Sequence, residues 1–465
     1  HSRLLEYPPM KSRENDYPGS VQAAAREAGL PPGPDELHTI GPGQPTFAAL
    51  ARWVPQYGDF FCVESRDRRD PSFVVSNPEY LKQILLTNHE NYAKGVGFER
   101  VKMLLGNGII VSDGEEWRRQ RTMMQPGFSR ANIARLSEPM RTLNRGLREE
   151  WTQLANTGQT IDITTAMSRL GLQVILRAVL SSDLDQLIQR EGTNPFAFLA
   201  EDTTRDIQTA VRFRNLARLI LGIVAERRTT GERPFDFLSL LMDARDRKSG
   251  TGMTDKELLD EVNTLIIAGH ETSAGTLNWA WYLLSQHPAV EARLLAELAT
   301  VTPGDDFTFD QLMGLNYAAC VLKETLRLYP PVWLFSRRAL KEDRLGEFRV
   351  PAGAHVFIAP YFLHRRPELW PDPDRFDPDR FDESHSPPVD RYAFIPFSAG
   401  ARRCIGEYFS FVEMQMHLAL LAPRFALRFQ PDPTLESNRT IELDPAVNLR
   451  TRHSIHLAVR HRNNS

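Results

Sequence analysis

The chain is poor in cysteine. Only Cys62, Cys320 and Cys404 occur among its 465 residues. A secreted disulfide framework needs an even and denser set, so this count favours a reducing cytoplasm. It also excludes an iron–sulfur cluster, which usually takes four thiolates. No other metal-ligand side chains cluster around Cys404 in the sequence, which disfavours a zinc site there.

The sequence also lacks a long apolar run and an excess of one charge. No stretch of 18 apolar residues is present, so we expect no transmembrane helix. No charged-then-apolar leader opens the chain. The net charge of -3 argues against a general nucleic-acid or anionic-membrane binder.

The patterning predicts a mainly α fold with small β-sheets. Residues 1–45 are rich in Pro and Gly and are expected to form an extended lead-in with one short helix. Residues 46–465 are expected to form a single domain, with β-rich parts at about 46–90 and 331–395 and helical parts at about 91–330 and 396–425. Strands are expected at 60–63, 72–76 and 354–359, with later turns at 431–433 and 444–445.

One cysteine lies in a tight, arginine-flanked run from Phe397 to Gly406, with the sequence Phe-Ser-Ala-Gly-Ala-Arg-Arg-Cys-Ile-Gly. Gly400 and Gly406 let backbone N–H groups approach a Cys404 thiolate. A helix beginning after Cys404 would place its positive end near the sulfur. Arg402 can pair with a cofactor carboxylate, and Phe397 can pack beside the sulfur. The alternative is a buried structural cysteine, which the combined pattern disfavours.

A long helix is expected over 254–287. Thr254 and Glu257 form a capping box, and Pro288 follows its end. Its middle reads Ile-Ile-Ala-Gly-His-Glu-Thr-Ser, with Glu271 followed by Thr272. An acid next to a hydroxyl in an apolar stretch suits proton delivery. The alternative is a solvated glutamate and a threonine that bonds back to its own helix.

Two further pairs lie at helical spacing. Glu324 and Arg327 share a face, as do Trp117 and Arg121. Alone, each pattern is more often a surface feature. A Trp N–H and an Arg guanidinium are nevertheless both donors to a carboxylate.

Together these motifs resemble the cytochrome P-450 family, the haem-thiolate monooxygenases, over about residues 45–460. The resemblance implies a triangular helical prism enclosing haem b, with Cys404 as the axial iron ligand and dioxygen as co-substrate. It implies that Glu271 and Thr272 deliver protons, and that Ala268 borders the distal side. It also implies a buried network of Glu324, Arg327 and Arg380, and cofactor contacts from Trp117, Arg121, Arg337, Phe397, Arg402 and Gly406. Arg338 is the alternative to Arg337.

The implied reaction is hydroxylation of a lipophilic small molecule. The expected pocket residues are Phe98, Val101, Leu104, Leu265, Val332, Trp333 and Leu334. Electrons are expected from a ferredoxin or flavodoxin-type donor with its reductase, docking at Arg403 or Arg119. The resemblance implies a soluble, cytoplasmic, monomeric enzyme. Epoxidation, oxidative coupling and peroxygenase chemistry remain alternatives, and a non-enzymatic haem sensor is disfavoured because a sensor needs no proton relay.

Overall fold

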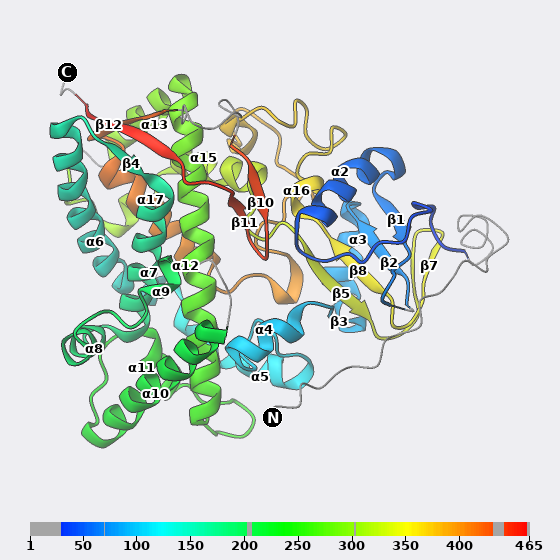
Figure 1. Cartoon of the computed structure of the whole chain (residues 1–465), viewed down its shortest axis with the longest axis horizontal. Helices are drawn as coiled ribbons and strands as arrows, with labels where there is room; N and C mark the ends of the chain where they lie inside the picture. The colour runs from blue at the N-terminus through cyan, green and yellow to red at the C-terminus, as the bar shows by residue number, and fades with distance from the viewer. Residues whose placement is uncertain (1–28, 69, 202–206, 302–303, 431–440, 463–465) are drawn as a thin grey trace, which may run out of the picture.

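The computed structural model has a large helical part on one side and a sheet-containing part on the other, with helix α12 between them (Figure 1). The structure describes residues 29–462, apart from residue 69 and the segments 202–206, 302–303 and 431–440. The expected turn at 431–433 and most of the N-terminal lead-in lie outside these described residues.

The helices follow the expected division of the chain. The α-helices are α2 (Gln44–Tyr57), α3 (Pro78–Lys82), α4 (Phe98–Leu105), α5 (Gly114–Met124), α6 (Arg130–Thr157), α7 (Ile163–Leu180), α8 (Asp183–Glu191), α9 (Phe198–Glu201), α10 (Ile207–Thr230), α11 (Phe237–Asp243), α12 (Asp255–Gln286), α13 (Pro288–Val301), α14 (Phe309–Met313), α15 (Asn316–Leu328), α16 (Pro360–Leu363) and α17 (Glu407–Leu421). Shorter helical turns are η1 (Gln83–Thr87), η2 (His89–Asn91), η3 (Gln125–Phe128), η4 (Pro378–Phe381) and η5 (Gly400–Arg402).

The main sheet has five strands in the order β1-β2-β8-β5-β3, and only the β2–β8 pair is parallel. Its strands are β1 (Phe60–Val63), β2 (Ser72–Val75), β3 (Tyr92–Lys94), β5 (Phe335–Ala339) and β8 (His355–Ile358). The smaller sheets are β4 (Thr160–Asp162) with β12 (His456–His461) and β9 (Phe425–Phe429), β6 (Asp343–Leu345) with β7 (Phe348–Val350), and β10 (Leu443–Pro445) with β11 (Leu449–Thr451).

One expected turn is wrong. Asp444 and Pro445 belong to strand β10, where they pair with Arg450 and Leu449 of β11. The bend falls one residue later, at 446–448. The antiparallel pairing therefore overrides the local turn preference of an Asp-Pro sequence.

Helix α12 begins and ends where its local signals predict. Thr254 caps it through the expected box with Glu257, and Pro288 begins the next helix. The element that α12 contacts most extensively is helix α7. A Cβ on Gly269 would lie 2.7 Å from Ile175 Cδ1, so this glycine permits the close approach of the two helices.

Helix α7 is also the one described helix that is long and apolar enough to cross a membrane by length and composition. In the fold, 67% of that segment is buried, largely against α12 and its neighbours. It is therefore a core helix of the folded protein, as the absence of an uninterrupted apolar run predicts.

Candidate active site

The cysteine loop is closed by a backbone bond from Cys404 N–H to the carbonyl of Phe397, at 2.9 Å. Phe397 packs against Phe411 of α17, with ring centroids 5.8 Å apart. Gly400 has φ +68°, and a Cβ there would overlap the carbonyl oxygen of Leu85. This corrects the expected role of Gly400: it lets the loop pack on η1 and does not serve the sulfur.

Backbone amides do point at the Cys404 sulfur. The N–H groups of Gly406 and Glu407, at the start of α17, lower the pKa of the thiol, although desolvation is larger and raises it overall. The side chain is nevertheless accessible. An accessible but desolvated sulfur faces a space bounded by protein, as a thiolate that ligates a buried cofactor requires.

Three cations converge close to this loop. Lys94 of β3 lies opposite Arg337 of β5 in the sheet register, and Arg402 comes from the cysteine loop. Desolvation lowers the pKa of all three, to about 10 for Arg337 and well below the usual range for Lys94, and the charge of Arg402 lowers the pKa of Lys94 and Arg337 further. Asp113 is the only carboxylate among the charges that act on Lys94 and Arg337.

This cation cluster, Lys94, Arg337 and Arg402, therefore has more positive charge than its protein partner neutralises. Asp113 pairs with Arg402 and accepts the backbone N–H of Lys94 at 2.7 Å. A group with two carboxylates would supply the missing negative charge. The donor set fits the two propionates of a haem whose iron lies near Cys404. Arg338 is exposed, so the geometry favours Arg337 over its neighbour.

The sequence motifs do not include Lys94, and Asp113 appears there only through the helix that follows it, yet both lie close to the cysteine loop through Arg402. Their relation depends on β3–β5 pairing and on the contact of Asp113 with the cysteine loop. The segments that meet here are far apart in the sequence, so no local motif marks them.

Trp117 and Arg121 both turn toward the cysteine loop. The guanidinium of Arg402 stacks over the Trp117 ring at 4.2 Å from its centroid. Arg121 Nη1 donates to the carbonyl of Arg403 at 2.8 Å. Desolvation lowers the pKa of Arg121, and the charge of Cys404 offsets part of this effect. The helical spacing thus brings the pair to one site, with Arg121 bound to loop backbone in this structure.

The acid and hydroxyl of α12 have partners. Thr272 Oγ1 donates to the carbonyl of Ala268 at 2.8 Å. The Glu271 carboxylate accepts from Asn448 Nδ2 at 2.5 Å and pairs with Arg450 Nη2 at 3.0 Å. The threonine therefore makes the back-bond that was the alternative interpretation, and the glutamate is not simply solvated.

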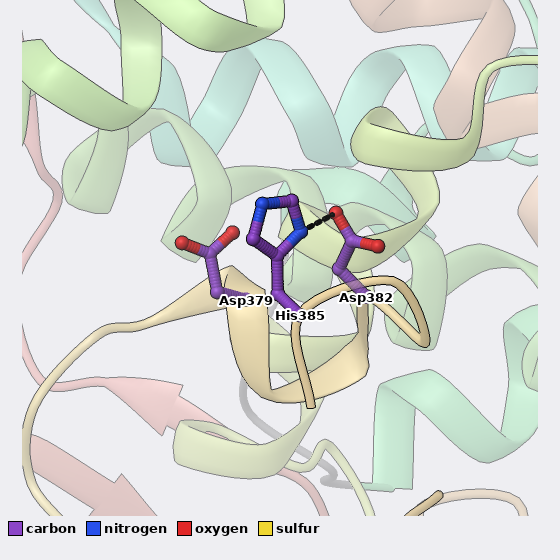
Figure 2. Close-up of side chains that lie close together, drawn as sticks. All are labelled: Asp379, Asp382 and His385. Carbon is purple, nitrogen blue, oxygen red and sulfur yellow. Dashed lines mark hydrogen bonds and ion pairs between the residues drawn. The ribbon is translucent and has the colours of Figure 1, made fainter. Parts of the chain in front are cut away.

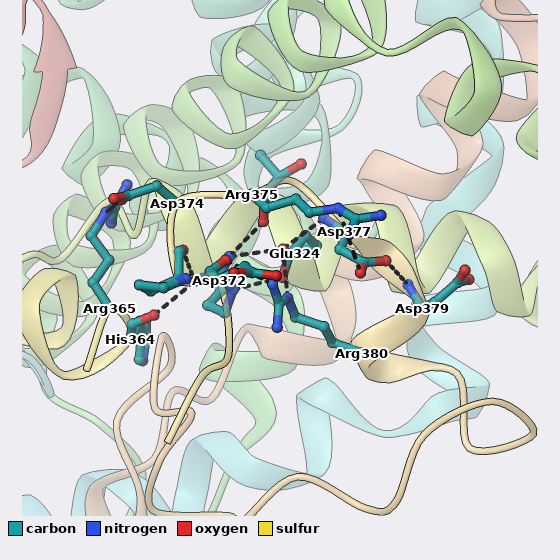
Figure 3. A network of polar contacts seen from close by, with 12 residues as sticks. Glu324, His364, Arg365, Asp372, Asp374, Arg375, Asp377, Asp379 and Arg380 are labelled. Carbon is teal, nitrogen blue, oxygen red and sulfur yellow. Dashed lines mark hydrogen bonds and ion pairs between the residues drawn. The ribbon is translucent and has the colours of Figure 1, made fainter. Parts of the chain in front are cut away.

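Glu324, Arg327 and Arg380 form one network (Figure 3). Glu324 and Arg327 are both 0% exposed and make a two-pronged pair at 2.7 and 2.8 Å. Arg380 Nε lies 3.4 Å from the same carboxylate. Arg327 also donates to the carbonyls of His364 at 2.8 Å and Pro373 at 2.6 Å. The network ties α15 to the segment before the cysteine loop.

The expected pocket residues are only partly supported. Leu265 is buried on α12, Phe98, Val101 and Leu334 are half-buried, and Val332 is exposed. The side chain of Leu104 lies outside the described part of the structure. Trp333 is a correction: it is fully buried, its ring packs on Phe47, and its Nε1 donates to the carbonyl of Ala446 at 2.8 Å, so it belongs to the core.

Two other features lie outside this site. Asp379, Asp382 and His385 have ligand atoms within 4.8 Å of one another (Figure 2). Both Asp379 oxygens already accept from Arg293 of α13 at 2.6 Å, so the cluster ties its loop to α13. A polar cleft of about 640 Å³ lies at Arg148, Thr152, Asp305, Pro423, Arg424, Phe425, His461 and Arg462, and shares no residue with the cysteine loop.

Comparisons with known proteins agree with this geometry. The Cytochrome P450 family model matches residues 37–200 and 193–446. Cyclooctat-9-en-7-ol 5-monooxygenase of Streptomyces melanosporofaciens is 33% identical over 82% of this chain and 85% of its own. Pentalenene oxygenase of Streptomyces avermitilis is 33% identical over 81% and 86%. A cytochrome P450DA heme domain crystal structure superposes with a TM-score of 0.78 at 26% identity, covering 93% of this chain and 98% of that one.

A mainly helical fold with an accessible cysteine sulfur in an arginine-flanked loop, and three cations close to that loop, fits a haem-thiolate protein. The family match covers most of the chain, and the chain therefore belongs to the cytochrome P450 family. It is a monooxygenase that uses haem b with a cysteine thiolate ligand and dioxygen to oxidise a lipophilic molecule, with electrons from redox partners. The sequence-based prediction of fold, cofactor and reaction class is thus confirmed.

Proposed function

We propose that the substrate is an apolar cyclic terpenoid and that the product is its alcohol. The observation that carries this proposal is the names of two relatives that each match more than four fifths of the chain, which refer to cyclooctat-9-en-7-ol and pentalenene. The apolar or half-buried side chains of Val101, Leu265 and Leu334 are consistent with such a ligand.

The same proposal assigns roles to the cofactor-site residues. Cys404 is the thiolate ligand, supported by the N–H groups of Gly406 and Glu407. The cation cluster holds the propionates, together with Trp117 and Arg121, and Phe397 packs beside the sulfur. When bound, the haem supplies dioxygen cleavage, which the thiolate favours by donating electron density. Glu324, Arg327 and Arg380 brace the segment behind it and have no chemical role.

Glu271 and Thr272 are proposed to deliver protons, with Ala268 bordering the distal side. The Thr272 hydroxyl donates its hydrogen bond to the Ala268 carbonyl, so its oxygen lone pairs are available to accept a hydrogen bond from a water molecule. Removal of this hydroxyl in Thr272→Ala should leave the haem in place and raise the hydrogen peroxide released per NADPH. An unchanged peroxide yield would reject Thr272 as part of the proton route.

The electron donor is proposed to be an acidic ferredoxin or flavodoxin that docks beside the cysteine loop. Arg119 is bound by Glu257 and by the carbonyl of Gly252, which leaves Arg403 as the better contact. Arg403 is 45% exposed and pairs with Glu407. Charge reversal in Arg403→Glu should slow reduction by the donor most strongly at low salt. We also propose a cytoplasmic monomer.

The deciding experiment is a spin-state titration of the purified holoenzyme with pentalenene, cyclooctat-9-en-7-ol and lauric acid. The terpenoids should convert the haem to the high-spin form at lower concentration than the fatty acid does. Turnover under 18O2 should then add one labelled oxygen atom to the bound terpenoid. Preference for lauric acid, or a product without the label, would overturn the proposal.

A further inference from the structure

Glu271 is held by a strand hairpin that comes from the far C-terminal part of the chain. Asn448 and Arg450, at the bend and on strand β11, each contact one oxygen of its carboxylate, at 2.5 and 3.0 Å. The Glu271 and Arg450 side chains are 20% and 28% exposed. Both partners are therefore close enough to orient the acid while water still reaches it.

The hairpin is itself fixed to the protein core. Leu449 N–H donates to the carbonyl of Pro331 at 2.8 Å, and the buried Trp333 donates to the carbonyl of Ala446 at the same distance. The three pairs of β10 with β11 set the register between these anchors. Asn448 and Arg450 consequently present their donors from a rigid element and not from a free loop.

His270, Glu271 and Thr272, in the middle of α12, face different partners. His270 is buried and lies 3.0 Å from Ser168 Oγ on α7, while Thr272 bonds back within its own helix. Only Glu271 is directed at the hairpin. The hairpin therefore contacts Glu271 directly, and it acts on His270 through charge, since the Arg450 guanidinium adds to the desolvation that lowers the pKa of His270.

We propose that Arg450 and Asn448 are positioning residues that aim the Glu271 carboxylate and keep it ionised between proton transfers. This inference deepens the proposed function and rests on the role of Glu271 in proton delivery. A guanidinium beside a carboxylate favours its ionised form, and an amide donor fixes the second oxygen. Neither residue is marked by a motif, because both act from a distant segment.

The proton balance follows from this arrangement. A hydronium ion of the solvent gives one proton to a Glu271 oxygen and becomes water, and Glu271 then gives one proton to a water molecule that the Thr272 oxygen can bind. The carboxylate is then ionised again and returns to Arg450 and Asn448. Without the Arg450 guanidinium, the Glu271 carboxylate remains but is held by Asn448 alone, so its direction is less fixed.

The test uses the reduced, carbon-monoxide-bound holoenzyme, whose C–O stretching band responds to polar groups on the distal side. Arg450→Gln should shift or split this band in the same sense as Glu271→Gln. The double variant should match Glu271→Gln alone, and Arg450→Lys should recover most of the wild-type band. Arg452→Gln is the matched control. It removes a guanidinium next to strand β11 that pairs with Glu442 and not with Glu271.

A second measurement uses dioxygen as the only probe, with spinach ferredoxin and its reductase as donors. The share of NADPH electrons released as peroxide should rise in Arg450→Gln toward the Glu271→Gln value, and stay at the wild-type value in Arg452→Gln. Wild-type bands and peroxide shares in Arg450→Gln, with altered ones in Glu271→Gln, would overturn the inference. A shift in neither variant would overturn it too, while loss of the thiolate-type Soret band in the wild-type protein would instead sink the haem-thiolate assignment.

Discussion

Replacing Glu413 with glutamine should stabilise the protein by a margin that grows as the pH rises from mildly acidic to mildly alkaline. Glu413 lies on α17, is 1% exposed, and neither of its carboxylate oxygens has an aligned hydrogen-bond donor. Burial raises its pKa to about 8, and the nearby Ser273 hydroxyl offsets only part of this effect. The side chain is therefore a neutral carboxylic acid at neutral pH.

The sign and size of the effect follow from proton linkage. The folded protein keeps the Glu413 proton up to about pH 8, whereas the unfolded chain releases it near the ordinary value of 4.5. Between these values the folded state binds more protons, so the free energy of unfolding falls by about 1.4 kcal/mol per pH unit. From roughly pH 5.5 to pH 8 this amounts to about 3 kcal/mol. Glutamine has the shape of the neutral acid and cannot titrate.

The assay is urea unfolding of both proteins at several pH values, followed by tryptophan fluorescence. The comparison is the difference between variant and wild type at each pH, because other titrating groups, including Glu261, then cancel. The exposed Glu226→Gln variant is the control and should show a constant difference. A constant difference for Glu413→Gln across the same range would refute the assignment of a buried neutral acid.

Two further predictions concern the cofactor site. Lys94→Met should speed haem loss to excess apomyoglobin roughly tenfold, because one charged contact is lost. The same variant should stabilise the haem-free protein by relieving cation repulsion, and the exposed Lys82→Met is its control. If the haem-free wild type unfolded more slowly than haem-free Lys94→Met, the charge argument would be contradicted. Gly400→Ala should destabilise the cysteine loop by about 3 kcal/mol or more and reduce the thiolate-type carbon monoxide band. Gly158→Ala is the control and should leave that band unchanged, because Gly158 has a similar φ of +65° but open space around it. Equal bands in the two variants would argue against the overlap of Gly400→Ala with Leu85.

The sequence predicted those features whose signals are local. The ends of α12 follow from Thr254, Glu257 and Pro288, which act within one helical turn of each end. The cysteine loop and the Glu324–Arg327 pair are likewise short motifs. Their residue types and spacing mark them, although their contacts extend to distant segments: Arg327 reaches His364 and Pro373, and Arg402 reaches Asp113.

Other features depend on contacts between distant segments and could not be predicted in this way. Lys94 joins the site only through strand pairing with Arg337. Gly400 was assigned to the sulfur, but its close neighbour is Leu85 on η1. Trp333 is one of the expected pocket residues, yet its ring packs on Phe47 and its N–H group donates to the carbonyl of Ala446. In each case tertiary packing decides the role.

Helix α12 sets the position of several parts of the site at once. On α12, N-terminal to Glu271 and Thr272, Asp260 accepts the backbone N–H of Asn107 at 2.9 Å and Glu261 accepts that of Ile109 at 3.0 Å. These bonds fix the segment between α4, which contributes Phe98 and Val101, and α5, which contributes Trp117 (Figure 1). Because burial raises the pKa of Glu261 to about 8, this anchor is mostly uncharged at neutral pH. Glu271 and Thr272, which we propose to deliver protons, are therefore held in register with the expected pocket residues of α4 and with Trp117 by a single helix.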